Sequence, residues 1–253
     1  MDTIGRRSSG RTKNKVEGNP FRLIQEIRER IRTSNESQEA GGSNRVKYLW
    51  LHVTAAGIEF GSNGHLSTED WLNVVDEAGA LGVQWVVIGW EATPGDGPDV
   101  WEICRWAQEV HDCHVGIHLL RGEPSEKDIE AMLQLKKDRT HVLADSVGMD
   151  RVGFLKEHGI DVCEADVNVT HRTGICTLPD DMVCVGSHGK LYTCGLVLGN
   201  ERYCLGSVFE RAFAHVVSDK NLPHHVPESA AREAHHSCNA CPPLMVQRTL
   251  QGK

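Results

Sequence analysis

The chain has 253 residues, of which 40% are hydrophobic, and its 27 basic and 35 acidic residues give a formal net charge of −8. This length can bury one full core or two small ones, and the negative charge argues against a general nucleic-acid-binding protein. No apolar run reaches about 18 residues and no secretory signal opens the sequence, so we expect a cytoplasmic protein without a membrane span.

Residues 1–45 are expected to form a basic tail, a short helix and a linker. Residues 1–19 carry scattered Lys and Arg and predict a disordered, solvated tail, with contact to an acidic partner as the alternative. Residues 20–33 repeat apolar side chains at helical spacing behind Pro20, which predicts a helix. Residues 34–45 are polar and predict a linker.

Strand and helix patterns alternate from residue 46 to residue 170. Short apolar runs predict strands at residues 47–54, 84–89, 114–120, 140–144 and 160–164. Amphipathic patterns predict helices from Ser67, with Asp70 completing a capping box, to Gly82, and at residues 99–111, 125–136 and 147–158. This order predicts an α/β fold with a parallel sheet, and about five units are too few to close an eight-stranded barrel. We therefore expect a partial (β/α) barrel or curved half-barrel.

Residues 171–253 are expected to form a second, small module built around cysteines. Residues 182–196 alternate about a turn at residues 187–189, which predicts a β-hairpin. Residues 206–218 are predicted to be helical, and a segment rich in Pro and His leads from there to Cys238 and Cys241.

Nine cysteines in a chain without an export signal favour metal ligands or reactive thiols over disulfides. Cys238 and Cys241 form a C-x-x-C pair, whose spacing lets both thiolates reach one centre. Cys176 and Cys194 bracket the predicted hairpin, so we expect all four cysteines to converge on one metal centre. Four thiolates suit an iron–sulfur cubane or a tetrahedral zinc site.

The remaining cysteines lie at positions that favour packing over metal binding. For Cys204 both core packing and metal binding stay open. The other four are expected to be small core residues: Cys104, Cys113, Cys163 and Cys184.

The pattern C-x12-G-x4-C from Cys176 to Cys194, the segment LGSVFE at residues 205–210 and the later C-x-x-C pair resemble the SPASM/twitch extension of radical SAM enzymes. No cysteine follows Cys241, so the resemblance implies the shorter twitch form. That form holds one auxiliary [4Fe–4S] cluster, here on Cys176, Cys194, Cys238 and Cys241.

The stretch from Tyr48 to Leu120 resembles the radical SAM core, in which the loop after the first strand carries three cluster-binding cysteines. Here the loop has the same spacing, but the three positions are Gly57, Gly61 and Gly64, which cannot bind iron. The motif that contacts the methionine amine of the cofactor reads GWEA at residues 89–92. The resemblance therefore implies a pseudo-radical-SAM protein that keeps the scaffold and is not expected to bind S-adenosylmethionine.

His52 and His118 lie near predicted strand ends, where an α/β sheet places its ligand crevice, and with Glu91 they are candidates for lining a pocket. Buried histidines satisfied by hydrogen bonds are the alternative. Two histidine pairs near the C-x-x-C could tune a cluster or ligate a second metal: His224, His225, His235 and His236.

These features predict an iron–sulfur protein that transfers electrons to, or assists the maturation of, a partner enzyme or peptide. One alternative is a divergent radical SAM-like enzyme with its own substrate. Another is a zinc-binding module that recognises a peptide. The sequence names neither the partner nor the substrate.

Overall fold

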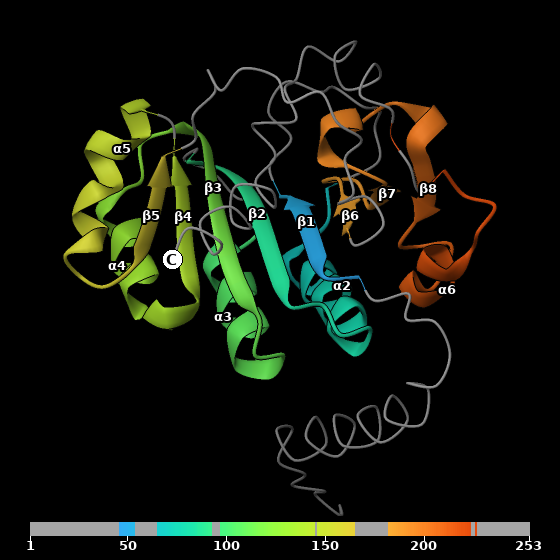
Figure 1. Ribbon diagram of the computed structural model, residues 1–253, viewed down its shortest axis with the longest axis horizontal. Helices are drawn as coiled ribbons and strands as arrows, with labels where there is room; N and C mark the ends of the chain where they lie inside the picture. Colours follow the sequence, from blue (N-terminus) through green and yellow to red (C-terminus); the bar gives the residue numbers. More distant parts are fainter. Residues whose placement is uncertain are drawn as a thin grey trace, which may run out of the picture. The chain divides into compact units, whose positions relative to one another are not determined.

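The computed structural model describes residues 46–53, 65–92, 97–144, 146–164, 182–223 and 226 (Figure 1). The chain divides into two units, Met1–Gly41 and Gly42–Lys253, and every described residue belongs to the second. The predictions for residues 1–45 thus lie outside the described residues, together with those for six of the site residues: Gly57, Gly61, Gly64, Cys176, Cys238 and Cys241.

The described residues form one open sheet of eight strands in the order β5-β4-β3-β2-β1-β6-β7-β8. Six strands pair in parallel: β1 (Tyr48–His52), β2 (Trp85–Ala92), β3 (His114–Gly122), β4 (Thr140–Ala144), β5 (Asp161–Glu164) and β6 (Met182–Val185). Two antiparallel strands follow at one edge: β7 (Lys190–Tyr192) and β8 (Cys204–Ser207). The α/β class and the parallel βα order are confirmed.

The α-helices pack on one face of this sheet, which we call the helical face (Figure 1). They are α2 (Thr68–Ala80), α3 (Val100–Val110), α4 (Glu126–Gln134), α5 (Ser146–Val152) and α6 (Phe213–Ser218). Alternate strand residues supply the other half of this core, with Leu49, Ile88 and Ile117 at 0% exposure. Within the described part of the chain, no helix has the length and apolarity needed to cross a membrane.

Local sequence sets the helix boundaries. Ser67 caps α2 and Ser125 caps α4, and in both cases an aspartate three residues later completes a capping box. Gly82 follows α2 with a φ of 82°, and Gly159 follows α5 and its 3-10 extension with a φ of 84°. Glycine adopts this conformation without strain. These signals explain why the helix positions were predictable.

Two predicted elements differ in the structure. The helix expected at residues 206–218 begins only at Phe213, because residues 204–207 form β8 with Gly206 at φ 129°. The helix expected at residues 147–158 is α-helical only as far as Val152, and a 3-10 turn, η2 (Gly153–Lys156), follows it.

The predicted hairpin is present, with Gly189 at φ 77° in its turn, but it does not begin a separate sheet. Its first strand, β6, pairs in parallel with β1, from Tyr48 opposite Met182 to Leu51 opposite Val185. The hairpin therefore extends the sheet of the predicted half-barrel.

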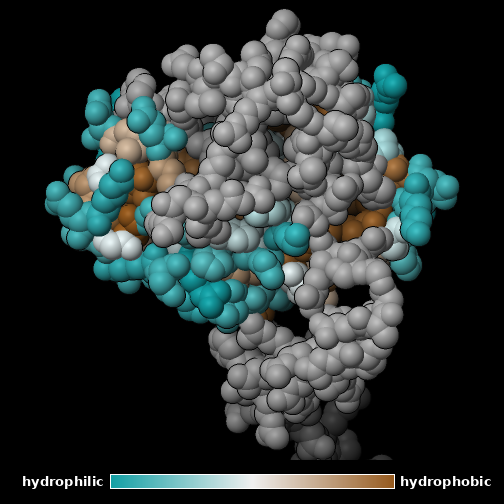
Figure 2. Space-filling view, viewed as in Figure 1, coloured by the Kyte–Doolittle hydropathy of each residue, from teal (hydrophilic) through white to brown (hydrophobic). Residues whose placement is uncertain are grey.

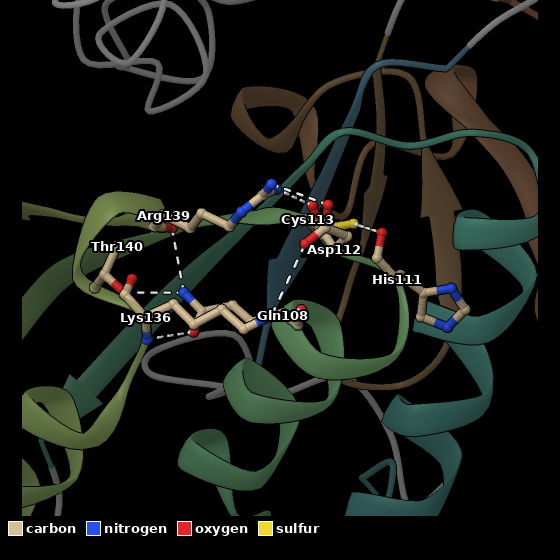
Figure 3. Close-up of polar contacts among 7 residues, drawn as sticks. All are labelled: Gln108, His111, Asp112, Cys113, Lys136, Arg139 and Thr140. Carbon is tan, nitrogen blue, oxygen red and sulfur yellow. Dashed lines mark hydrogen bonds and ion pairs between the residues drawn. The ribbon is translucent and has the colours of Figure 1, made fainter. Parts of the chain in front are cut away.

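A buried polar network joins the end of α3 to the turn before β4 (Figure 3). Gln108, 1% exposed, donates to the Thr140 hydroxyl at 2.9 Å and accepts from the backbone N–H of Lys136 at 2.9 Å. Arg139 pairs with Asp112 at 2.9 Å beside it. The network lies at the amino ends of the strands, where a βα fold places contacts that serve stability.

Candidate functional site

Alternate strand residues point to the sheet face opposite the α-helices, which we call the second face. Among the described residues, its core consists of strand residues, Cys194, residues of two 3-10 turns, η4 (Gly195–Val197) and η5 (Glu201–Tyr203), and Val226. The central members are largely aromatic or sulfur-containing: Tyr48, Trp50, Trp85, Met182, Cys184, Tyr192 and Cys194. In the same view, Figure 2 shows hydrophilic residues along the outer sides of the described region and hydrophobic ones recessed behind them.

The three predicted pocket residues all lie on the second face, toward the carboxyl ends of the strands. His52 on β1 and His118 on β3 both pair with Gly89 on β2, so the two imidazoles flank a position that has no side chain. Glu91 lies two residues farther along β2 and is 7% exposed. The sheet register thus brings together residues that the sequence places far apart.

Cys194 lies on the same face and belongs to its core, at 8% exposure. Its side chain caps η4, where Sγ accepts a hydrogen bond from the backbone N–H of Leu196 at 3.4 Å. The next residue, Gly195, packs on the indole of Trp50, since a Cβ at Gly195 would lie 2.6 Å from Cε3 and Cζ3 of that ring. The Trp50 ring centroid is in turn 5.0 Å from that of His52. Cys194 is therefore linked to the pocket residues through Trp50.

Trp50 carries a buried polar atom that stands out on this face. It is 2% exposed, and its Nε1 has no hydrogen-bond partner among the described residues. A buried donor without an acceptor costs about 1–3 kcal/mol. The unused N–H therefore marks a place where an acceptor would be favourable.

The segment that leads toward Cys238 is tied to the chain beside Cys194. The hydroxyl of Thr193, itself 1% exposed, donates a hydrogen bond to the carbonyl oxygen of Pro223. Val226, 6% exposed, belongs to the same core as Cys194. The segment that leads to the C-x-x-C pair therefore begins on the side of the sheet that carries Cys194.

A second cluster of titratable groups lies on this face near the amino ends of β3 and β4. Trp85 stacks on His114 with ring centroids 4.5 Å apart, and His141 lies 4.7 Å from Trp85. Nδ1 of His141 is 3.0 Å from Oδ2 of Asp161. Burial, followed by the charges of His141 and Arg139, lowers the pKa of His114 below its ordinary value. This cluster favours neutral His114.

Of the remaining cysteines, Cys104, Cys113 and Cys184 are buried as expected, whereas Cys163 and Cys204 are only partly buried. Cys104 and Cys184 are 0% exposed, and burial raises the pKa of the Cys104 thiol far above its usual range. Cys113 is 1% exposed and its thiol donates to the Val83 carbonyl at 3.3 Å. Cys163 and Cys204 are partly buried against the core of the second face.

A metal centre can be tested against only part of its expected ligand set. Cys194 is the one predicted ligand among the described residues, and within them no group of three His, Cys, Asp or Glu side chains could hold a metal ion. The surroundings of Cys194 fit a metal-bound thiolate, because a backbone N–H already points at its sulfur and hydrogen bonds of this kind stabilise ligand sulfurs. The donor chemistry at Cys194 is therefore compatible with an iron–sulfur cluster.

Two features of this face are not predicted by the sequence pattern. The contact of Trp50 with Gly195 and the pairing of β1 with β6 join distant segments, and local periodicity carries no signal for either. The shared face of His114 and His118 does have a signal, because residues 114, 116 and 118 alternate along β3.

No protein-family profile matches the sequence, and no curated protein sequence matches it. The fold is similar to Streptococcus suis SuiB bound to S-adenosylmethionine, with 13% identity over 85% of this chain and 72% of that chain and a TM-score of 0.46. A structure of SuiB bound to the precursor peptide SuiA gives 14% identity over 85% and 73%, with a TM-score of 0.48. A further SuiB structure gives 11% identity over 83% and 74%, with a TM-score of 0.47. At TM-scores below 0.5 these likenesses assign neither a family nor residue roles.

Proposed function

We propose that this chain is an iron–sulfur protein that holds one [4Fe–4S] cluster on Cys176, Cys194, Cys238 and Cys241. It would pass electrons to, or assist the maturation of, a partner enzyme or peptide. The observation that carries the proposal is the buried sulfur of Cys194, which accepts a backbone hydrogen bond on the face opposite the α-helices. When bound, the cluster would supply one-electron transfer, over a range of potentials that the residues do not fix.

Chain connectivity supports a shared centre. Cys176 precedes the start of β6 at Met182 by six residues, which span at most about 20 Å when extended. The bond between Thr193 and Pro223 starts the segment toward Cys238 beside Cys194. The segments that carry the other three proposed ligands therefore join the described fold close to Cys194 along the chain or on the same side of the sheet.

The same face supports a role in recognition. His52 lies 5.0 Å from the Trp50 ring that contacts the Cys194 loop, His118 lies across Gly89 from His52, and Glu91 is a buried acidic residue farther along β2. These side chains could bind polar groups of a partner close to the cluster. The proposal therefore places recognition and electron transfer on one side of the sheet.

Metal analysis of anaerobically purified protein tests the proposal. Wild type should contain about four iron atoms per chain and show the visible absorption of an iron–sulfur cluster. Cys194→Ser and the double variant Cys238→Ser/Cys241→Ser should lose most of the iron, because serine is a poor ligand for the cluster. Cys163→Ser is the matched control on the same face and should keep the wild-type iron content.

Two outcomes would contradict the proposal. Stoichiometric zinc without iron would favour a zinc-binding module that recognises a peptide. Cleavage of S-adenosylmethionine to 5′-deoxyadenosine by the reduced protein would favour a radical SAM-like enzyme, despite the glycines at positions 57, 61 and 64.

A further inference from the structure

Three ring side chains lie together at the amino ends of adjacent strands on the second face. Trp85 on β2 stacks on His114 on β3, with ring centroids 4.5 Å apart and ring planes 18° apart. The His141 ring on β4 lies 4.7 Å from that of Trp85 and 5.7 Å from that of His114. Trp85 is 5% exposed, so this packing keeps most of its indole away from water.

His141 brings a second titratable group to the cluster. It lies opposite Asp161 on β5 in the sheet register, and its Nδ1 is 3.0 Å from Oδ2 of that carboxylate. When His141 carries a proton, the two side chains form an ion pair. This pair fixes the imidazole of His141, and any positive charge on it, beside His114.

The position of His114 suits a neutral imidazole. Its Nδ1 is buried and has no hydrogen-bond partner among the described residues. A neutral imidazole can leave this nitrogen without a hydrogen, whereas a protonated one carries an N–H at both nitrogens. Protonation would therefore create a buried donor without an acceptor there, and a positive charge 5.7 Å from the His141 ring.

The charges around His114 act in the same direction. Burial lowers its pKa most, followed by the positive charges of His141 and of Arg139 in the turn before β4. The carboxylates of Asp138 in that turn and of Asp112 before β3 oppose this with smaller effects. His114 therefore takes up a proton only when the pH falls below its ordinary value of 6.5.

We infer that His114 and Trp85 form an acid-sensitive switch, in which the His114 ring leaves the Trp85 indole for water when it takes up a proton. His114 is half-buried and is the first residue of β3, so rotation of its side chain can bring the ring into solvent. Its backbone N–H stays bonded to the Gln84 carbonyl at 2.9 Å, and the strand register is kept. The switch uncovers Trp85 at this end of the second face, and it does not depend on the proposed metal centre.

NMR of the full chain, with fluorinated tryptophans and carbon-13-labelled histidines, tests the switch in a titration from about pH 8 to about pH 5. The variants Trp85→Phe, Trp71→Phe and His114→Gln assign the signals. In wild type, the Trp85 fluorine signal should move with the same midpoint as the His114 carbon signal, below pH 6.5. Trp71, at 0% exposure in the core of the helical face, is the internal control, and its signal should not follow this midpoint.

Two variants separate the switch from simple packing. His114→Gln keeps a polar side chain that cannot be charged, so the pH-dependent movement of the Trp85 signal should disappear. His141→Phe keeps a ring beside Trp85 and removes a neighbouring positive charge, so the His114 midpoint should move to higher pH. A packing role for His141 alone would leave that midpoint unchanged.

Two results would overturn the switch. The face of an indole attracts a cation, and a Trp85 signal that stays constant while His114 titrates would show that this attraction holds the protonated ring in place. An unchanged His114 midpoint in His141→Phe would show that the two imidazoles are not coupled. The first result is read in wild type, so the test stands even if a variant does not fold, and neither result bears on the iron content.

Discussion

At the scale of single residues, His114 shows how burial on the second face changes chemistry. Its pKa is lowered from 6.5, first by burial and then by the positive charges of His141 and Arg139. The folded protein therefore binds a proton at His114 less readily than the unfolded chain does. By linkage, this residue's contribution to stability is present above pH 6.5 and is lost as the pH falls through the lowered pKa of the folded state.

We predict that His114→Phe weakens the acid sensitivity of the fold. Phenylalanine keeps a ring against Trp85 and removes the titrating group. The free energy of unfolding, measured by urea titration between about pH 7 and about pH 5, should fall less in the variant than in wild type. Equal pH dependence in His114→Phe and wild type would show that another group governs this range.

The residues of the candidate site were predictable to different degrees. That His52, Glu91 and His118 lie near strand ends was predictable, because strand periodicity and the position of strand ends can be read locally. The packing of Trp50 on Gly195 was not predictable, because it joins β1 to the turn η4, and these two segments meet only after the sheet forms.

At the scale of elements, the βα rhythm was predictable because caps, glycine stops and apolar runs coincide. Ser67 and Ser125 begin helices, and the apolar runs of β1 to β5 lie where buried parallel strands were expected. Strand β8 was missed because LGSV at residues 205–208 is short, contains a glycine and continues into a helical pattern. Short segments of this kind take their structure from the neighbouring strand, here β7.

We predict that Gln108 holds α3 to the turn before β4. Gln108→Ala leaves the Lys136 N–H without its acceptor and removes the donor to the Thr140 hydroxyl, which still donates to the Lys136 carbonyl. The change should lower the free energy of unfolding by about 2–3 kcal/mol. Gln134→Ala, at the exposed end of α4, is the control and should change it by less than about 0.5 kcal/mol. Urea denaturation measures both, and equal losses would show that the network of Figure 3 adds nothing to stability.

At the scale of the whole molecule, all eight strands of the described residues belong to one sheet. β1 lies in the interior of the sheet, with β2 on one side and β6 on the other. The expected half-barrel at residues 46–170 therefore shares hydrogen bonds with the expected module at residues 171–253.

We predict that a fragment of residues 46–170 does not fold as a stable unit. Removing β6 exposes the edge of β1 and the side chains of Leu49 and Leu51, both 0% exposed. Circular dichroism and urea titration should show no cooperative unfolding of the fragment, whereas residues 46–253 should unfold in one transition. A cooperative transition in the shorter fragment would show that the sheet tolerates loss of its β6 side.

The pairing of β1 with β6 also has a consequence during protein synthesis. β1 leaves the ribosome well before the strand that completes its second edge, because 129 residues lie between His52 and Met182. Until then the nascent sheet keeps an open, apolar edge of the kind that chaperones shield. Closure of this edge, and any loading of iron at the later cysteines, must therefore be late events in the maturation of this protein.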